Sequence, residues 1–391
     1  MDLNKLELAK SVSDYIINHR RNLHKIPEIG LNLPLTMEYV TKELRKLGIE
    51  YEEFEDISCI VGVIKGERSG KTISLRADMD GLPIIENTNL TFTSTNGNMH
   101  ACGHDSHTAI LLGAAKLLQD LKSELVGSVK LIFQGGEEYP GGAKPLIERG
   151  ILKDVSAILG LHGGIIDPSI PKGHIGFKTG PIMASMDRFL IKVIGKGGHG
   201  AHPEDTIDSI NIACEIVQSL NKIVARQIPP TEPAILSVTR IDGGFNQNIL
   251  PDIVEIEGTC RSTNEDIRHF IYKRIGEVSS AIAAGYGGKT EYIYDFKYPA
   301  VQNDEAFTKF VIESTKKLVA PRLIDILKVP VMASDDMSFY LEEIPGTYFF
   351  LSNPKGEKDF VSHHRSDFDI DEDLMYLGVG VFVQVCLDYL S

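Results

Sequence analysis

Residues 99–115 read MHACGHDSHTAILLGAA, a polar segment with three histidines and a cysteine that leads into an apolar helix predicted over residues 108–121. Apolar stretches that favour strands lie on both sides of it, at 59–64, 72–76, 128–133 and 157–161. Strands rich in Val, Ile and Leu that alternate with helices are typical of a mostly parallel sheet covered on both faces. This alternation of strands and helices around residues 99–115 therefore predicts an α/β fold.

The same alternation extends outward towards both ends of the chain. Residues 4–24 and 36–47 carry apolar side chains at helical spacing. Beyond residue 297, a helix is expected at 306–319, a strand at 348–351 and a closing helix at 372–390. The two outer parts of the sequence are therefore expected to build one α/β domain.

The pattern differs between residues 182 and 297. Strands are predicted at 187–195, 235–241, 254–261 and 290–296, with helices at 205–226 and 264–284. Asn264 is the expected N-cap of the second helix, ahead of Glu265 and Asp266. This β-α-β-β-α-β order predicts a ferredoxin-like unit, with one face of its antiparallel sheet free for a partner.

The chain length supports more than one domain. A single core rarely grows beyond roughly 250–300 residues, and the chain has 391. We expect a first α/β segment at residues 1–181, the ferredoxin-like unit at 182–297 and the second α/β segment at 298–391.

Charge and composition narrow the classes of function. The formal net charge of -14 argues against nucleic acid and anionic membranes as partners, because both bind basic surfaces. No segment reaches the ~18 apolar residues of a membrane span, and the first residues lack the apolar core of a signal peptide. Five scattered cysteines without a CxxC pair disfavour a disulfide framework. A cytoplasmic location is expected.

Four further polar clusters lie next to predicted strands. LRADMDG belongs to the strand at 72–76, QGGEEYPGG to the strand at 128–133, LHGG to the strand at 157–161 and SHHRSDF to the strand at 348–351. In open parallel sheets, ligands bind outside the carboxyl ends of the strands. We therefore expect these clusters and MHACGHDSH to converge on one crevice.

The residue types in the clusters indicate a metal site. Thiol, imidazole and carboxylate ligands suit Zn²⁺, Mn²⁺ or Co²⁺, and Cys102 and His104 lie close together in a predicted loop. Of the adjacent pair Glu137 and Glu138, one can bind metal while the other takes a proton from a water whose pKa the metal has lowered. Taken singly, these residues also fit structural roles, so spacing alone leaves both interpretations open.

Six motifs carry a resemblance to a known family. They are LRADMDGLPI, MHACGHDSHTAILLGAA, GGEEYPGGAKPLIERGIL, LHGG, GKGGHGAHPEDTIDSI and NILPDIVEIEGTCRS. Together they resemble the metal-dependent amidohydrolases, which include aminoacylases, hippurate hydrolase, plant auxin-conjugate hydrolases and archaeal zinc carboxypeptidases. The resemblance runs from residue 20 to the C-terminus. It implies a metallopeptidase-like catalytic domain with an inserted lid and dimerisation domain.

The resemblance implies two divalent ions per subunit, Zn²⁺ or Mn²⁺, with Co²⁺ and Ni²⁺ as further options. The implied metal ligands are Cys102, His104, Glu138, His162 and His364. Glu137 would be the general base and later the acid. Asp78 matches the carboxylate that orients a ligand, and Asp80 is the weaker candidate for that role.

Three residues of the ferredoxin-like unit are implied to face the substrate, namely His199, Asn248 and Arg261. In relatives the histidine at the position of His199 reaches the substrate carbonyl oxygen, usually from the neighbouring subunit. A homodimer or higher homo-oligomer through the lid domain is therefore expected. Asn248 and Arg261 match residues that often face the substrate carboxylate, and a domain-packing role stays open for Arg261.

Several positions depart from the family pattern. The chain has His363-His364-Arg365 where a His-Ser/Asn-Pro type sequence is common. Counting back from Phe368 favours His364 as the last ligand, and His363 stays an alternative. Asp335 stands where glutamate is usual, so no substrate role is assigned to it. GLNLPLT at residues 30–36 replaces a more polar stretch.

The resemblance implies a small-molecule substrate, an N-acyl-L-amino acid, whose amide bond is cleaved by water that Glu137 deprotonates. Release of C-terminal residues from short or N-blocked peptides is the alternative, because both substrates present an amide beside a free carboxylate. Two other classes stay open. One is a binding protein that has lost catalysis, and the other is a hydrolase with Cys102 as nucleophile and His104 or His107 as base.

Overall fold

The computed structural model describes residues 5–356 and 360–391 and divides the chain into two compact units. The first unit comprises the residues up to Ile182, Gln302–Val331 and Asp335–Ser391, and the second comprises Met183–Val301 and Met332–Ser334. Each unit has its own core of buried apolar side chains. The catalytic and lid roles expected for the two parts of the chain stay predictions.

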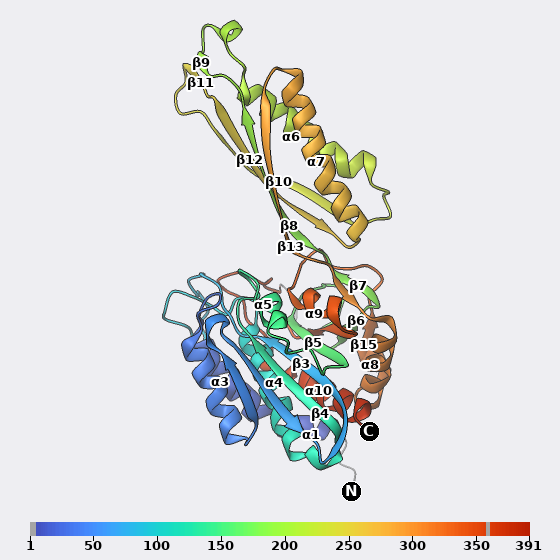
Figure 1. The fold of residues 1–391 in the computed structure, drawn as a ribbon. Coiled ribbons are helices and arrows are strands. Elements are labelled where there is room, and N and C mark those ends of the chain that lie inside the picture. Colours follow the sequence, from blue (N-terminus) through green and yellow to red (C-terminus); the bar gives the residue numbers. More distant parts are fainter. Residues whose placement is uncertain (1–4, 357–359) are drawn as a thin grey trace. The chain divides into compact units, whose positions relative to one another are not determined.

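The first unit is built on a sheet with the strand order β1-β2-β4-β3-β5-β16-β6-β15 (Figure 1). Its strands are β1 Glu50–Phe54, β2 Cys59–Lys65, β3 Arg68–Asp78, β4 Val126–Gln134, β5 Ala157–Gly164, β6 Ile175–Phe177, β15 Ile324–Ile326 and β16 Gly346–Ser352. The neighbours β4, β3, β5 and β16 run parallel, whereas β1, β2 and β6 join antiparallel. The predicted α/β fold with a mainly parallel central sheet is confirmed.

Helices cover both faces of this sheet. They are α1 Lys5–Ser11, α2 Ser13–His24, α3 Pro34–Lys46, α4 His104–Asp120, α5 Ala143–Glu148, α8 Glu305–Leu318, α9 Met337–Glu343 and α10 Met375–Tyr389. Leu161 of β5 reaches Gly378 of α10, whereas the preceding Gly160 faces Met337 of α9. Because successive strand residues point to opposite faces, α10 and α9 lie on opposite sides of the sheet.

Among the local features of the first unit that differ from the predictions are a broken helix and an additional edge strand. The helix predicted over 4–24 is broken at Val12 into α1 and α2, and its residue 4 lies outside the described residues. Strand β1, with the sequence EYEEF, was not predicted, because its charged side chains suit only an edge strand.

None of the helices in the described parts of the chain has the length and apolar character that a membrane span requires.

The second unit has a four-stranded antiparallel sheet in the order β10-β12-β8-β13. Its elements are β8 Met186–Ile194, α6 Ser209–Gln227, β10 Ala234–Gly243, β12 Ile253–Ser262, α7 Glu265–Gly285 and β13 Lys289–Tyr298, with a small sheet of β9 Gly198–His199 and β11 Ile249–Leu250. Both helices lie on the same side of the larger sheet (Figure 1). The order of the larger elements is the β-α-β-β-α-β order predicted from the sequence.

Side-chain caps fix where the helices of the second unit begin. The Asn264 side chain accepts hydrogen bonds from the N–H groups of Asp266 and Ile267, so the predicted N-cap of α7 is confirmed. Helix α6 begins at Ser209, four residues after the predicted start, because Asp208 caps it by accepting from the Asn211 N–H. The remaining strands, β7 Gly180–Met183 and β14 Val301–Asn303, pair with each other.

A buried ion network fastens α2 to the beginning of α4. The guanidinium of Arg20, 1% exposed, donates to Asp105 at 2.9 Å, to Asp369 at 2.9 Å and to Glu372 at 3.1 Å. Removing one partner of such a network leaves buried charge without compensation. The network therefore ties residues far apart in sequence to the helix that carries the polar segment.

The variant Arg20→Met is expected to lower the free energy of unfolding by about 3–5 kcal/mol, because three carboxylates lose their buried cation. Urea denaturation followed by circular dichroism measures the change. The exposed pair of Lys309 and Glu305 supplies the control, since Lys309→Met should leave the midpoint nearly unchanged. Equal midpoints for native protein and Arg20→Met would show that the network does not stabilise the fold.

The same network gives a pH-dependent stability through His24. Its Nδ1 lies 2.7 Å from Asp105 and its Nε2 lies 3.2 Å from Glu86. Burial alone would lower the pKa of His24, but the two carboxylates outweigh burial and raise the pKa to about 9 from 6.5. Because the folded pKa exceeds the unfolded one, the stabilisation is complete below pH 6.5 and is lost as the pH rises to about 9.

We therefore expect the free energy of unfolding to fall by about 3 kcal/mol as the pH rises from 6.5 to about 9. The variant His24→Asn should remove most of this slope, because it has no titrating group at that position. Urea denaturation at intervals of half a pH unit measures both curves. Parallel curves for the native chain and the variant would rule out His24 as the source.

Candidate metal centre

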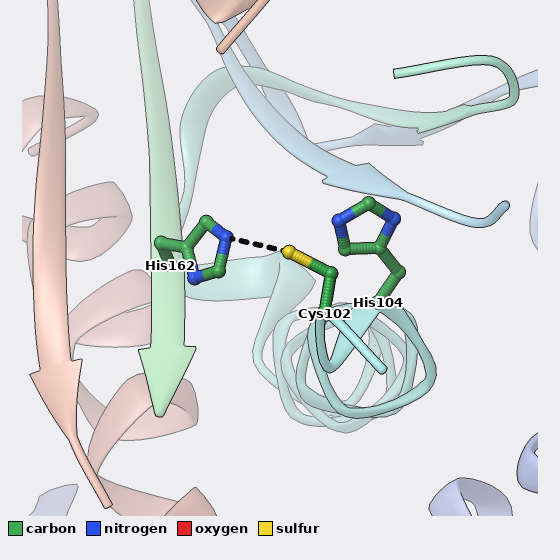
Figure 2. Close-up of side chains that lie close together, drawn as sticks. All are labelled: Cys102, His104 and His162. Atoms are coloured by element: carbon green, nitrogen blue, oxygen red, sulfur yellow. Dashed lines mark hydrogen bonds between the residues drawn. The ribbon is translucent and has the colours of Figure 1, made fainter. Parts of the chain in front are cut away.

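The beginning of α4 holds Cys102 and His104 side by side (Figure 2). Gly103 between them has a φ of 86° and is the N-cap residue of the helix. Glycine adopts this left-handed conformation without steric cost, so the chain can turn directly into the helix at His104. The sequence predicted a loop as far as residue 107, and the helix begins earlier for this reason. The side chains of Cys102 and His104 are both buried.

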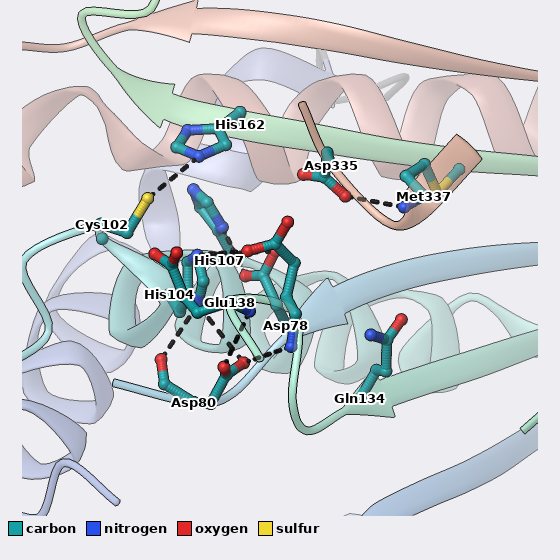
Figure 3. Close-up of polar contacts among 12 residues, drawn as sticks. Asp78, Asp80, Cys102, His104, His107, Gln134, Glu138, His162, Asp335 and Met337 are labelled. Carbon is teal, nitrogen blue, oxygen red and sulfur yellow. Dashed lines mark hydrogen bonds and ion pairs between the residues drawn. The ribbon is translucent and has the colours of Figure 1, made fainter. Parts of the chain in front are cut away.

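Two histidines present one ring nitrogen each to the space beside Cys102. His162 of β5 has its Nε2 3.5 Å from Cys102 Sγ (Figures 2 and 3), and its Nδ1 donates to the Gly163 carbonyl oxygen at 2.8 Å. His104 Nδ1 likewise donates to the Asp80 carbonyl oxygen at 2.9 Å. Its Nε2 is buried and makes no hydrogen bond with any described residue. Both rings therefore direct Nε2 into the site.

Glu137 and Glu138 occupy the loop that follows β4. The Asp80 carboxylate accepts the N–H of Glu137 at 2.9 Å and that of Glu138 at 3.1 Å, which fixes the direction of the loop. Glu137 Oε2 then lies 3.9 Å from His104 Nε2, and Glu138 Oε1 lies 2.9 Å from His364 Nε2. Asp80 thus orients His104 and the glutamate loop together (Figure 3).

His364 reaches Glu138 from a left-handed backbone conformation, with a φ of 64°. This conformation costs a non-glycine residue roughly 1–2 kcal/mol, and its N–H donates to the Ala101 carbonyl oxygen at 2.9 Å. That bond ties the segment to the residue before Cys102. His363 Nε2 instead donates to the Gly163 carbonyl oxygen at 3.0 Å. The geometry favours His364 over His363 as the last ligand.

Asp78 lies at the end of β3 and is completely buried. One carboxylate oxygen accepts from His107 Nδ1 at 2.6 Å (Figure 3). The other accepts from Arg76 at 2.8 Å and lies 3.9 Å from His104 Nε2. Arg76 is held from its other side by Asp336, at 2.7 Å. Asp78 therefore supports the site from behind the histidines.

The thiol and the first glutamate lie in a strongly negative environment. Burial, followed by the charges of Glu138 and Glu137, raises the pKa of Cys102 well above its ordinary value. Burial and then the charge of Asp335 raise the pKa of Glu137 well above its ordinary value. A nearby divalent cation would favour the ionised form of both groups.

The two histidines differ in their electrostatics. Burial lowers the pKa of His162 well below its ordinary value, and His107 and His363 lower it further. Burial would also lower the pKa of His104, but the Asp78 and Asp80 carboxylates raise it to about 10. His162 is therefore neutral, as a metal ligand must be, while a cation at His104 would displace a proton.

The donor set fits a pair of divalent ions. Ligand atoms lie within 4.8 Å of one another in three overlapping groups, which are Cys102, His104 and His162; His104, Glu137 and Glu138; and Cys102, Glu138 and His364. The overlap suits two ions that share ligands, and the mixture of thiol, imidazole and carboxylate suits borderline metals. His107 also lies near Asp78 and His104, but both of its ring nitrogens are already hydrogen-bonded.

In the second unit, His199 and Asn248 are neighbours. His199 of β9 pairs with Ile249 of β11, and the Asn248 carbonyl oxygen accepts from the Gly200 N–H at 2.8 Å. His199 Nδ1 accepts from the Ala201 N–H at 3.0 Å. When the ring is neutral, its proton is therefore on Nε2, which can donate a hydrogen bond to a ligand.

Arg261 lies at the other end of this unit's sheet. It stands eight residues beyond Ile253, the first residue of β12, which corresponds to roughly 26 Å along an extended strand. Its Nη1 is buried and has no hydrogen-bond partner in the described parts of the chain. Arg268, by contrast, binds Asp187 at 2.6 Å. Arg261 therefore has an unused donor and takes no part in the ion pair of Arg268 with Asp187.

Arg76 and Asp336 were not given a role from the sequence. His107 was considered only as the base of a cysteine hydrolase, and the role of Asp80 was ranked below that of Asp78. The signals in the sequence are the repeated acidic residues in RADMD and the last histidine of CGHDSH. Neither signal shows which backbone or side chain each group would meet.

A largely buried group of thiol, imidazole and carboxylate side chains at the carboxyl ends of parallel strands is typical of a metal-dependent hydrolase. The model of peptidase family M20/M25/M40 matches residues 74–388, and the chain belongs to this family. It is therefore an enzyme, a metal-dependent amidohydrolase or peptidase, and the predicted resemblance is confirmed. The interpretation as a binding protein without catalysis is not supported.

Individual relatives match nearly the whole chain. Thermostable carboxypeptidase 1 of Saccharolobus solfataricus is 41% identical, over 95% of this chain and 94% of the relative. N-acetylcysteine deacetylase of Bacillus subtilis is 37% identical, over 98% of each. The crystal structure of the Bacillus subtilis YxeP protein, described as a dinuclear metal-binding peptidase, has a TM-score of 0.84 at 34% identity and covers 97% of this chain and 99% of its own.

Proposed function

We propose that the enzyme cleaves the amide bond of N-acyl-L-amino acids at a site with two divalent ions. The proposed metal ligands are Cys102, His104, Glu138, His162 and His364. The observation that carries the proposal is the position of Glu137, whose carboxylate lies 3.9 Å from His104 Nε2 on the same loop as Glu138. A proton carrier beside a ligand cluster is what hydrolysis by an activated water requires.

When bound, the two ions would polarise the substrate carbonyl and make a water molecule more acidic. His104 and His162 would hold them with Nε2, because the Nδ1 of each ring donates to a backbone carbonyl. Cys102 would bind as the thiolate. Zn²⁺ and Mn²⁺ are the first candidates for this mixture of donors, with Co²⁺ and Ni²⁺ next.

Glu137 would take the proton from the attacking water and pass it to the nitrogen of the leaving amino acid. Its burial and its acidic neighbours raise its pKa well above the ordinary value, and bound cations would lower that pKa again, so that the carboxylate is ionised and can accept a proton. Asp80 holds the N–H of Glu137 and would keep the carboxylate in place during both transfers. Asp78 would support His104 from behind and act without touching the substrate.

Recognition of the substrate would involve both ends of the ferredoxin-like unit. Arg261 offers a buried donor without a partner among the described residues, which suits the free carboxylate of the substrate. His199 Nε2–H would stabilise the oxyanion, with Asn248 beside it. A dipeptide-sized substrate spans only roughly 7 Å. His199 and Arg261 of one chain are too far apart to contact it together, which supports delivery of His199 by a second copy in a homodimer or higher homo-oligomer.

One other mechanism and one other class of substrate are less well supported. Attack by Cys102 as nucleophile requires a thiolate, but the pKa of Cys102 is raised well above its ordinary value. A carboxypeptidase acting on short or N-blocked peptides would use the same groups, and one relative is named a carboxypeptidase. The relative that is named for the deacetylation of N-acetylcysteine favours the acyl-amino acid.

The proposal is tested with the purified full chain reconstituted with Mn²⁺, Zn²⁺, Co²⁺ or Ni²⁺. The substrates are N-acetyl, N-benzoyl and N-benzyloxycarbonyl derivatives of one amino acid, compared with dipeptides that end in the same amino acid. We expect kcat/KM for the best acyl derivative to exceed that for the best dipeptide. Faster cleavage of dipeptides would identify the enzyme as a carboxypeptidase, and activity that survives complete removal of metal would reject the metal mechanism.

A further inference from the structure

The backbone of one residue, Gly163, lies between three histidines at the back of the metal centre. Its N–H donates to His107 Nε2 at 2.8 Å. Its carbonyl oxygen accepts from His162 Nδ1 at 2.8 Å and from His363 Nε2 at 3.0 Å. The carbonyl group that orients the proposed ligand His162 is thus contacted by His363, and the N–H of the same residue is held by His107.

The direction of each hydrogen bond follows from the backbone. The Gly163 N–H can only donate, so His107 Nε2 is an acceptor and the ring proton is on Nδ1, which donates to Asp78 at 2.6 Å. The Gly163 carbonyl can only accept, so His162 carries its proton on Nδ1 and His363 carries one on Nε2. His162 Nε2 therefore carries no proton, and its lone pair lies beside Cys102.

The residues next to Gly163 leave room for the ring of His363 beside the backbone. Gly164 has a φ of 94°, and a Cβ on it would collide with the ring of His363. The Gly164 N–H donates to the Asn353 side chain at 2.6 Å. The ring of His363 also packs edge-on against that of His162, with centroids 5.0 Å apart. Gly164, the second glycine of LHGG, thus allows the ring of His363 to approach the backbone closely.

We propose that His107 and His363 are positioning residues that orient His162 through the backbone N–H and carbonyl groups of Gly163. The inference rests on the proposed metal site, and it gives each histidine a role other than ligand or catalytic base. His363 uses Nε2 for the carbonyl group, and His107 uses both nitrogens. Ligand histidines whose second nitrogen is held by a neighbouring group bind metal more tightly than unsupported ones.

Matched variants of the full chain separate hydrogen bonding from packing. His363→Gln retains an N–H donor at the reach of Nε2, whereas His363→Phe retains only the ring. His107→Gln retains an acceptor for the Gly163 N–H, whereas His107→Asn retains only the donor to Asp78. Competition with a chromophoric chelator gives the dissociation constants for Zn²⁺, and thermal unfolding of each metal-free variant checks its fold.

We expect His363→Phe and His107→Asn to weaken the binding of one Zn²⁺ ion by about 10–100-fold, while the two Gln variants stay within about threefold of the native chain. Equal affinities within each pair, whether native-like or weak, would overturn the inference. If one pair fails to fold without metal, the other pair decides. A native chain that binds no Zn²⁺ would reject the metal site itself, and with it this inference.

Discussion

Replacing Glu137 with glutamine is expected to lower kcat by about 10³-fold, because an amide cannot take a proton from water or return it to the leaving amine. The substitution changes neither size nor the backbone N–H that Asp80 holds. Both metal ions should therefore remain bound, and KM should change little. Steady-state kinetics on the best acyl derivative, together with metal analysis of the same sample, measure the effect.

The adjacent carboxylate supplies the control. Glu138 is the proposed ligand, and its side chain lies 2.9 Å from His364, so Glu138→Gln should lose metal as well as activity. The two substitutions are at adjacent positions, and metal analysis should find the ions retained in Glu137→Gln and lost in Glu138→Gln. Retained turnover in Glu137→Gln would remove Glu137 as the proton carrier, and loss of metal from that variant would assign it to the ligands instead.

Replacing His199 with alanine is expected to lower kcat by about 10²–10³-fold, the usual cost of removing one oxyanion donor. The imidazole is exposed and its Nδ1 accepts only from the nearby Ala201 N–H, so the fold should tolerate the change. If a second copy provides His199, then chains with His199→Ala and chains with Glu137→Gln should complement each other. A mixed dimer would contain one site with both groups intact.

Random exchange of subunits makes half of the dimers mixed, so a mixture of the two inactive variants should recover about a quarter of the native activity. The mixture is unfolded and refolded together, and its activity is compared with that of each variant treated alone. A mixture no more active than its components would show that His199 serves its own chain. Full activity of His199→Ala alone would remove this residue from the reaction.

Much of the fold was predictable because it depends on local pattern. The order of strands and helices in the second unit and the N-cap at Asn264 follow from side chains close together in sequence. Strand β1 was missed because its glutamates give no apolar alternation, and only its pairing with β2 makes it a strand. The beginning of α4 was placed too late because apolar periodicity starts at Thr108, whereas the helix starts with the buried His104.

The site was predictable only in part, for a physical reason. The convergence of Cys102, His162 and Glu138 follows from parallel strands that end at the same edge. The groups behind them depend on contacts across long sequence separations. Arg76 meets Asp336 from 260 positions away, and the Gly163 carbonyl meets His363 from 200. Composition and spacing carry no information about such pairings. The choice of His364 over His363 came from the spacing to Phe368, and it stays a prediction that the contact between His364 and Glu138 supports.

The most direct test of the proposed two-metal site is anomalous diffraction from crystals of the native chain grown with Zn²⁺ or Mn²⁺. We predict two peaks about 3.5–4 Å apart, bound by the side chains of Cys102, His104, Glu138, His162 and His364, with Glu137 close by but unbound. A single peak, or peaks held by Asp78 and His107 instead, would contradict the proposed two-metal site.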